Sequence, residues 1–291
     1  MVSGGSDPLQ DAVPRFAAAP LVVVTRFSFL GKSGWKSEAS RDADLLFSPD
    51  RLRLRLNLFR WITLPSLACQ TQQDFTHLIL TSDRLPDWAM TELRQACLQA
   101  YGGEGRFTIV ADPPGPAAVS LRRHLTESCH SPLVAQAVLD DDDGLATDFV
   151  ADLRQHLSDV DAADAGSARR PLAFVSFAAG YGFEITPNAD GRPEARVYQH
   201  SYPYINCGLT LVGPPGDTKN ILGIKHQKEP PAHGAVLVRG KRMFLRSVHG
   251  MNDSRVARTD RWILVDPWRK AGNIRARFPW LLDPGAFWNQ G

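Results

Sequence analysis

Hydrophobic and polar positions along the first half of the chain form blocks that predict strands and helices in alternation. Short apolar or β-branched runs, typical of buried strands, lie at residues 21–25, 75–81, 107–111 and 133–139. The segments between them have helical apolar spacing and Pro or Gly boundary signals, at residues 52–67, 86–103 and 121–129. Pro65 is expected to bend or divide the first of these helices. The alternation predicts an α/β fold with a mostly parallel central sheet flanked by helices on both faces.

The second half of the chain has a different pattern, because Gly and Pro interrupt its apolar positions every few residues. This pattern predicts hairpins and loops that complete the sheet. The short extended segments lie at residues 172–177, 183–186, 196–200, 209–212, 236–238 and 243–248. We expect residues 1–19 to be flexible, and the halves 20–157 and 158–291 to form a single domain.

Composition narrows the class of protein. The chain has 291 residues, is 43% apolar and carries a net charge of +2, which allows a large core and gives little support for nucleic-acid binding. Its four cysteines are scattered without a C-x-x-C pair, so we expect no zinc site and no disulfide framework. A reducing compartment follows as the default, and we expect the protein to be cytoplasmic. The start lacks a secretory signal and no apolar run could span a membrane, while peripheral membrane association stays open.

The fourth predicted strand ends in four consecutive aspartates, Asp140, Asp141, Asp142 and Asp143, followed by Gly144. The apolar spacing then becomes helical, so the carboxylates are predicted to lie at the carboxyl end of a buried strand, where open α/β sheets bind ligands. Adjacent carboxylates repel one another, and their oxygens suit Mg2+ or Mn2+, which commonly bridges a carboxylate to phosphates. The pattern therefore predicts a site for a metal and a diphosphate.

The acidic run has two other interpretations. A solvated first turn of a helix, favoured by the helix dipole, stays open. A calcium loop of the D-x-[DN]-x-[DN]-G type fails by spacing, because counting back from Gly144 places Leu139 at the first ligand position and Val150 at that of the bidentate Glu.

Three stretches of the first half resemble the bacterial family of putative rhamnosyltransferases: LVVVTRFS, NLFRWITLPSLACQTQQDFTHLILTSD and AVLDDDDGLATDF. The order of elements also resembles that of GT-A glycosyltransferases, and the likeness covers residues 20–250. It implies a GT-A-like, Rossmann-like fold and a metal-dependent, inverting enzyme with Mn2+ or Mg2+ as cofactor. The implied donor is a nucleotide-diphosphate sugar carrying UDP, dTDP or GDP, and the acceptor is a hydroxyl of a glycan, lipid or small molecule.

The resemblance also implies roles for the aspartates, because the GT-A acidic motif has the form Asp-x-Asp and is often followed by another Asp. Asp140 would be the first member, near the ribose or the metal, and Asp142 the second, on the metal. Asp143 would ligate through water or orient its neighbours. Asp141 would be the position between them on the donor side. Because all four residues are Asp, the register of the motif can shift by one.

A late histidine closes the metal or diphosphate site in some GT-A folds, and His249 in the stretch SVHGMNDSR is the residue that resembles it. Asn252, Ser254 and Arg255 on the same loop are expected near phosphate. A buried histidine with a structural role is the alternative for His249. The Gln-x-x-Arg-Trp motif of processive enzymes is missing, which disfavours polymer synthesis.

Candidate donor-binding residues lie at the other predicted strand ends and on one helix. Resemblance to GT-A enzymes assigns base and ribose contacts to Thr25 and Arg26 after the first strand and to Ser82 and Asp83 after the second. Arg122 and Arg123 precede the acidic strand, and one of them is expected to reach the diphosphate, because arginine donors match phosphate oxygens. The alternatives are a surface ion pair for Arg26, a turn or helix cap for Ser82 and Asp83, and a solvated helix face for the arginine pair.

The catalytic base is sought in the second half, where GLTLVGPPGDTKNILGIKHQKEP resembles the acceptor side of the family. A carboxylate or imidazole there would remove the proton of the acceptor hydroxyl. The candidates are His226, Glu229, Asp253 and Asp217, and a surface charge is the alternative for each. Two other functions stay open: another metal-dependent nucleotide-processing enzyme, such as a nucleotidyltransferase or phosphohydrolase, and a non-catalytic nucleotide-sugar-binding module.

Overall fold

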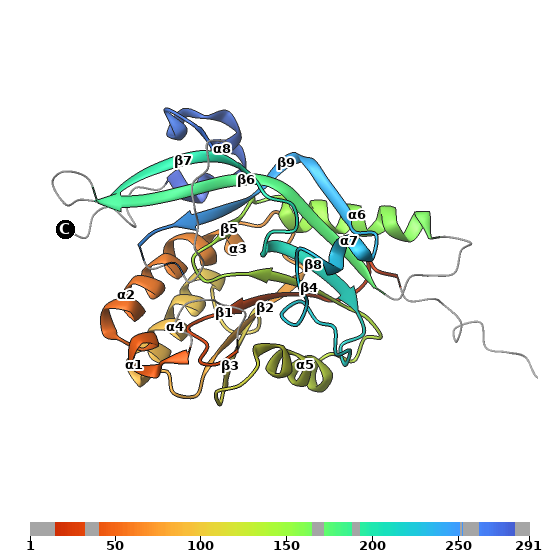
Figure 1. Ribbon diagram of the computed structural model, residues 1–291, viewed down its shortest axis with the longest axis horizontal. Helices are drawn as coiled ribbons and strands as arrows, with labels where there is room; N and C mark the ends of the chain where they lie inside the picture. Colours follow the sequence, from red (N-terminus) through yellow and green to blue (C-terminus); the bar gives the residue numbers. More distant parts are fainter. Residues whose placement is uncertain are drawn as a thin grey trace, which may run out of the picture.

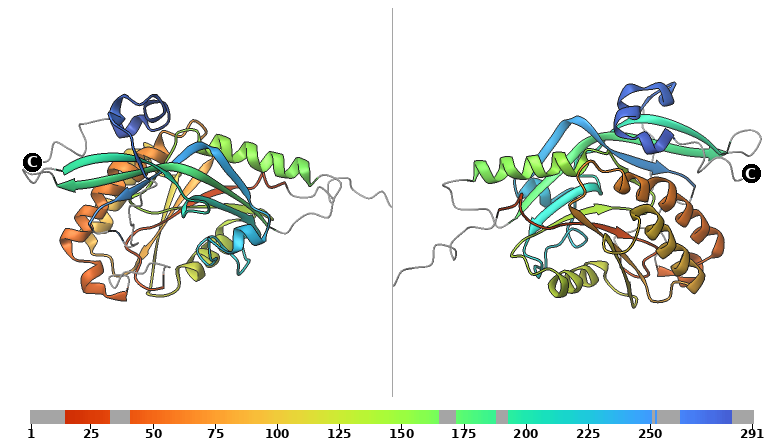
Figure 2. Two further views of the ribbon diagram at one scale, coloured as in Figure 1. Left: turned by 45° about the horizontal axis from the view of Figure 1, so that its top comes forward. Right: turned by 180° about the vertical axis from the view of Figure 1, so that it is seen from behind.

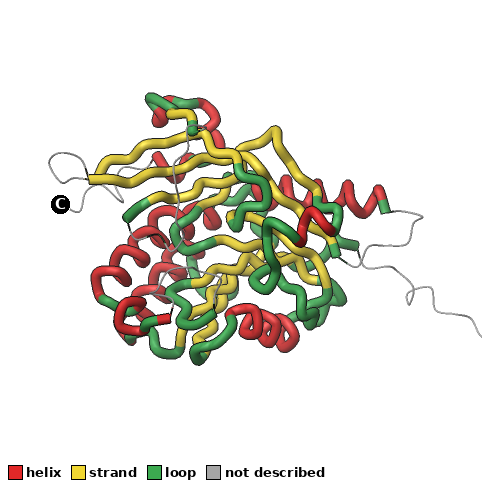
Figure 3. The backbone as a smooth tube through the Cα atoms, viewed as in Figure 1, coloured by secondary structure: helices red, strands yellow, loops and turns green. Residues whose placement is uncertain are grey.

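The computed structural model describes residues 15–32, 41–164, 172–187, 193–250, 252 and 262–282. A central sheet runs through these residues, with helices around it (Figures 1 and 3). The strand order is β10-β7-β6-β8-β4-β1-β2-β3, and β9 pairs with β5 and β6. The strands are β1 (Leu21–Arg26), β2 (Phe75–Ser82), β3 (Phe107–Asp112), β4 (Val134–Leu139), β5 (Gly144–Leu145), β6 (Ala173–Pro187), β7 (Pro193–Ser201), β8 (Cys207–Gly213), β9 (Val236–Val248) and β10 (Ile263–Leu264).

The first half of the chain builds the parallel part of the sheet, in which β3, β2, β1 and β4 lie side by side. Side chains alternate between the two faces, so Val23 packs with α6 (Phe149–Ala163) and Val24 with α5 (Ala117–Ser128). The helix α4 (Asp87–Tyr101) ends at Gly102, which has a positive φ of 72°. Figure 2 shows α5 and α6 on different sides of the sheet. The predicted α/β class with helices on both faces is confirmed.

The helical segment between β1 and β2 changes its pitch just before Pro65, where a bend or a division was expected. It comprises α1 (Ala43–Leu46), α2 (Pro49–Leu58), a π-helical turn η2 (Phe59–Thr63) and α3 (Leu64–Ala68). Pro65 has no N–H to donate and its ring crowds the carbonyl of the preceding turn, and the wider π turn lies directly before it. The helix therefore continues past the proline with a local change of pitch.

The second half adds β8, β6, β7 and β10 antiparallel to their neighbours, and β9 returns parallel to β6. The predicted hairpin character is confirmed for β6 and β7. The division of residues 172–186 and 236–248 into short segments is wrong, because β6 and β9 are each one long strand. Gly180 and Gly182 lie inside β6 and do not end it. A Cβ at these positions would lie 2.4 Å from Phe244 and 2.3 Å from Trp262, so both positions require glycine. These glycines make room for aromatic rings.

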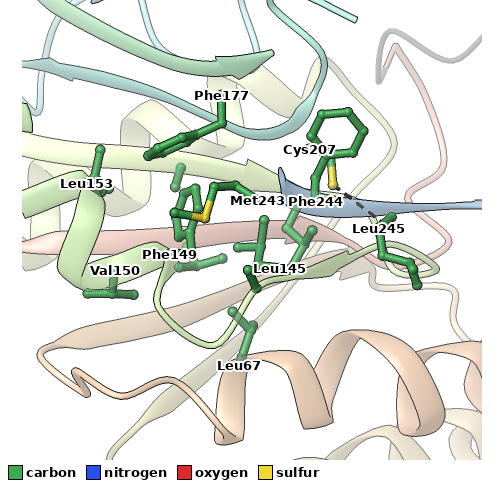
Figure 4. Close-up of a cluster of buried hydrophobic side chains, with 14 of the residues drawn as sticks. Leu67, Leu145, Phe149, Val150, Leu153, Phe177, Cys207, Met243, Phe244 and Leu245 are labelled. Carbon is green, nitrogen blue, oxygen red and sulfur yellow. Dashed lines mark hydrogen bonds between the residues drawn. The ribbon is translucent and has the colours of Figure 1, made fainter. Parts of the chain in front are cut away.

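Three elements near residue 280 close the core behind the aspartates: η3 (Trp268–Lys270), α8 (Gly272–Arg277) and η4 (Pro279–Leu282). The short helix α7 (Glu229–Ala232) precedes β9. Figure 4 shows the apolar cluster around Leu145, Phe149 and Phe244, and Phe278 belongs to the same core. A Cβ at Gly144 would lie 2.6 Å from the indole of Trp280, so the glycine after the aspartates is required by this packing.

The remaining expectations concern the N-terminal segment, membrane spans and the cysteines. Residues 1–14 of the segment expected to be flexible lie outside the described residues, whereas Phe16 is buried and its N–H donates to Asp161 of α6 (2.9 Å). Within the described part of the chain, no helix combines the length and the apolar character that crossing a bilayer requires. All four cysteines are free thiols.

Candidate functional site

The four aspartates between β4 and β5, residues 140–143, form the acidic segment. Asp140 has a side chain that is 20% exposed, Asp141 is completely buried, and Asp142 and Asp143 are nearly so. The following helix, α6, begins only at Phe149. The interpretation as a solvated first turn of a helix is therefore wrong. Buried carboxylates require cations or hydrogen-bond donors nearby.

Arg55 of α2 supplies the first of these cations. Its buried guanidinium donates from Nε (3.2 Å) and Nη2 to the two oxygens of Asp141, and from Nη1 to Oδ2 of Asp142 (2.8 Å). Paired donation of this kind gives strong, directional ion pairs. Asp141, expected on the donor side, is enclosed by protein, with both of its oxygens bonded to Arg55.

Arg26 supplies the second cation from the end of β1. Its side chain is 5% exposed, and its Nη2 lies 2.5 Å from Oδ1 of Asp140. The strand β1 pairs directly with β4, which brings the two strand ends together. The sequence-based candidate Arg26 thus lies against the acidic segment as a buried ion pair, and the alternative of a surface pair is wrong.

Asp142 is held from a second side by the loop after β9. The Nε2 of His249 lies 3.0 Å from Oδ2 of Asp142, and Nδ2 of Asn252 donates to the same oxygen (3.2 Å). Asn252 also accepts the backbone N–H of His249 (2.6 Å). Burial alone would raise the pKa of Asp142, but Arg55 and His249 together bring that pKa below its usual range. Asp142 is therefore ionised at neutral pH.

Asp143 has weaker compensation than its neighbours. Its Oδ1 accepts the backbone N–H of Ser247 (2.8 Å), and its carbonyl accepts Oγ1 of Thr63 (2.9 Å). Burial and the negative charges of Asp142 and Asp140 raise the pKa of Asp143 well above its usual value, while the half-buried Arg246 of β9 acts in the opposite direction. Asp143 is therefore the carboxyl group of the segment whose negative charge the protein stabilises least.

The acidic segment suits a divalent cation. Four carboxyl groups face two bonded arginines, and carboxylate oxygens are ligands that Mg2+ and Mn2+ prefer, so the residues fit such an ion in charge and in ligand type. Among the described residues, no three side chains of His, Cys, Asp or Glu already converge on one point.

The candidates at the other strand ends have different surroundings. Thr25 is buried, and its Oγ1 lies 2.9 Å from Nε2 of His77. Ser82 is buried at the end of β2, where its Oγ accepts the N–H of Arg84 (3.2 Å) in the turn that follows, and Asp83 is exposed beside it. Their hydrogen bonds match a structural cluster for Thr25 and a turn for Ser82.

The two helix arginines are not brought to the acidic segment. Arg123 forms an ion pair with Asp112 at the end of β3, where Oγ of Ser120 also donates. Arg122 is half-buried, and its carbonyl accepts Oγ1 of Thr126 (2.8 Å). No hydrogen bond or ion pair within the described ranges joins either arginine to the acidic segment.

The candidate bases are likewise placed by local contacts. Nδ1 of His226 lies 2.7 Å from the carbonyl of Tyr204, Glu229 accepts the N–H of Lys225 (3.1 Å), and Asp217 accepts that of Lys219 (2.9 Å). In the part of the chain that the structure describes, none of the three bonds to the acidic segment. Residues 253–261, which include Asp253, Ser254 and Arg255, lie outside the described residues.

Three residues at the site were not predicted: Arg55, Thr63 and Arg246. Arg55 had a signal in the sequence, because it lies on the apolar face of its helix with Leu52 and Phe59, where a charge requires a partner of opposite sign. Thr63 and Arg246 had none, since their positions depend on how η2 and β9 pack against the acidic segment.

Solved structures with similarity to this chain include three bacterial proteins. S. aureus TarS (residues 1–349, in complex with UDP) has a TM-score of 0.40 and 10% identity over 78% of this chain, which spans 60% of that chain. HddC from Yersinia pseudotuberculosis has a TM-score of 0.36 and 12% identity over 78% of this chain and 89% of its own. A putative nucleotide-diphospho-sugar transferase from Desulfovibrio desulfuricans G20 has a TM-score of 0.38 and 11% identity, and the match covers 94% of this chain and 98% of that one.

No curated protein matches the chain significantly. A family model described as "Putative rhamnosyl transferase" matches residues 20–261, which is most of the chain, so the protein belongs to this family of glycosyltransferases.

Proposed function

We propose that the protein is a metal-dependent, inverting glycosyltransferase that moves a sugar from a nucleotide-diphosphate sugar to a hydroxyl acceptor. The observation that carries this proposal is the buried acidic segment at the carboxyl end of β4, whose negative charge exceeds that of Arg26 and Arg55 bonded to it. A fold holds such a cluster together most readily around a cation. Family membership supplies the reaction class.

The ion would be Mn2+ or Mg2+, held by Asp140, Asp142 and Asp143 with His249 beside them. When bound, it would act as a Lewis acid that neutralises charge on the departing diphosphate. The protein's part is to keep these carboxylates ionised and in place. Arg55 and His249 do this for Asp142, whose lowered pKa leaves it charged at neutral pH.

The cations around the segment suit the donor's diphosphate. Arg26 lies at the strand edge beside Asp140, and Arg246 lies near Asp143 without a hydrogen-bonded partner among the described residues. A guanidinium in such a place can bind phosphate oxygens in pairs. The nucleotides to test are UDP, dTDP and GDP.

The acceptor is proposed to be a glycan, lipid or small molecule, and the base to be His226, Glu229 or Asp253. An imidazole or carboxylate would have to lie within hydrogen-bond reach of the acceptor hydroxyl. The free thiols agree with the cytoplasmic location that we propose, with or without peripheral contact with a membrane. NMR analysis of the anomeric configuration of the product would test inversion.

A thermal-shift screen tests the proposal as a whole. Each of UDP-, dTDP- and GDP-sugars is added with and without Mn2+, and a ligand of the native state raises the midpoint of unfolding. We expect one donor and Mn2+ to raise the midpoint together by more than the sum of their separate effects. A rise with plain nucleotides but not sugars would favour a nucleotidyltransferase or phosphohydrolase. Donor binding without turnover would favour a binding module.

A further inference from the structure

One continuous helical segment, α2–η2–α3, contacts both the side chains and the backbone of the acidic segment. Arg55 of α2 contacts two of the four carboxylates, and Thr63 at the end of η2 contacts the backbone. Oγ1 of Thr63 lies 2.9 Å from the carbonyl of Asp143 and 3.4 Å from that of Asp140. The side chains and the backbone of the segment are thus fixed by the same element.

The contacts of Arg55 are unequal. Asp141 receives two donors, one on each oxygen, and it is completely buried. Asp142 receives one donor, on Oδ2, and this oxygen also faces His249 and Asn252. Within the described residues, no hydrogen bond reaches Oδ1 of Asp142. Arg55 therefore occupies both oxygens of Asp141, whereas Oδ1 of Asp142 is left without a hydrogen bond from the described residues.

A guanidinium can bond to both Asp141 and Asp142 in this way, whereas the ammonium group of a lysine cannot. Arginine presents its donors in a rigid planar fork that can span two carboxylates, whereas lysine offers a single point charge. The π turn Phe59–Thr63 sets how Arg55 and Thr63 face the acidic segment relative to a regular α-helix, and such turns are frequent at functional sites.

We propose that Arg55 is a positioning residue for the donor and metal site, and that Asp141 is its counter-charge rather than a contact for donor or ion. Arg55 orients Asp142 so that Oδ1 is presented to the ligand. This inference rests on the proposed function, because it concerns the same site. It removes Asp141 from the set of ligands and adds a residue from α2 that makes no contact with the substrate.

The first experiment compares Arg55→Lys with the matched control Arg53→Lys. Arg53 lies two residues earlier on α2 and its side chain is 69% exposed. Mn2+ affinity is measured by electron paramagnetic resonance titration, and folding by the thermal midpoint. We expect Arg55→Lys to weaken Mn2+ binding by about 10- to 100-fold, as loss of a residue that orients metal ligands typically does, and Arg53→Lys to leave it unchanged. Unchanged affinity in Arg55→Lys would overturn the inference.

A milder variant keeps the test independent of folding defects. Asp141→Asn retains an oxygen that accepts from Arg55, so we expect its Mn2+ affinity and donor KM to stay close to those of the wild type. Asp142→Asn should lose Mn2+ binding. If Asp141→Asn loses Mn2+ affinity as Asp142→Asn does while remaining folded, Asp141 is a ligand and the inference is wrong.

A double variant separates positioning from stability. Arg55→Met leaves Asp141 buried without its partner. The double variant Arg55→Met with Asp141→Leu removes both charges of the Arg55–Asp141 ion pair. We expect the double variant to recover most of the lost thermal midpoint but not the Mn2+ affinity, because Asp142 still lacks its support. Recovery of both would show a purely structural pair. If the wild-type protein itself binds no Mn2+, the proposed function fails together with this inference.

Discussion

Thr25 and Arg26 are neighbours on β1, yet they belong to two buried polar clusters of different character. Thr25 bonds to Nε2 of His77 (2.9 Å), and Nδ1 of His77 lies 2.8 Å from the hydroxyl of Tyr101. This cluster is neutral, because burial lowers the pKa of His77 to about 3. Arg26 instead forms an ion pair with Asp140 in a cluster that contains four aspartates and Arg55.

The difference indicates which cluster needs a ligand. In the neutral cluster both nitrogens of His77 have partners, so the polar atoms support a fixed packing of β1, β2 and α4. In the acidic cluster burial, followed by the charges of Asp142 and Asp140, raises the pKa of Asp143 well above its usual value, so an anion at this position is poorly stabilised by the described residues. The neutral cluster should therefore control stability, and the acidic one function.

The largest expected effect is on activity, from Asp142→Asn. Removing this charge should lower kcat by about 100- to 1000-fold, the usual cost of losing a group that stabilises charge in the transition state. Mn2+ should no longer raise the thermal midpoint. The control is Asp159→Asn on the exposed side of α6, where the side chain is 62% exposed. Full activity in Asp142→Asn would break the comparison.

The second effect is on stability, from His77→Phe. This change leaves Thr25 and Tyr101 without their shared partner in a buried place, which should cost about 1–3 kcal/mol in the free energy of unfolding. Denaturant unfolding measures the loss. Mn2+ affinity should stay at the wild-type value, and a parallel loss of affinity would show that the two clusters are not separable.

The third effect is a dependence of stability on pH. The folded-state pKa of His77 is about 3 against an ordinary 6.5, so between these values the unfolded chain binds a proton that the folded chain does not. Stability is thus complete above pH 6.5 and falls as the pH falls towards 3, by up to about 1.4 kcal/mol per pH unit. His77→Phe should reduce this slope in unfolding curves. It should not abolish it, because the pKa of His200 is also lowered, to about 4.

The smallest effect is a gain in stability from Asp143→Asn. An amide keeps the bond from the Ser247 N–H and needs no proton to be neutral, so it avoids the cost of a carboxyl group that burial, Asp142 and Asp140 disfavour as an anion, and unfolding should become harder by about 1 kcal/mol. The same variant should lose stabilisation by Mn2+. A variant that is less stable without Mn2+ would mean that the charge of Asp143 is already compensated.

Sequence reasoning placed the strand, the acidic segment and the following helix correctly because each has a local signal. The apolar run before Asp140 and the helical spacing after Gly144 depend only on neighbours in the chain. Arg26 was likewise found from its place at a strand end. The family likeness is confirmed by the matching family model.

The remainder depended on contacts between distant segments. Gly180 and Gly182 had the composition of a turn, but they lie inside β6 because aromatic rings from elsewhere occupy the space above them. Asp141 could not be told apart from its three identical neighbours until Arg55 was placed beside it. Such assignments require the partner's position, which no local pattern contains.

The contact between Gly144 and Trp280 has a consequence for synthesis of the protein. The backbone N–H of Thr147 also donates to the carbonyl of Arg277 (2.9 Å), so the chain just after the aspartates is bound on its far side by residues that are made after β9. A nascent chain that has emerged from the ribosome only as far as β9 lacks this support. The surroundings of the aspartates are therefore completed only after α8 and η4 have emerged as well.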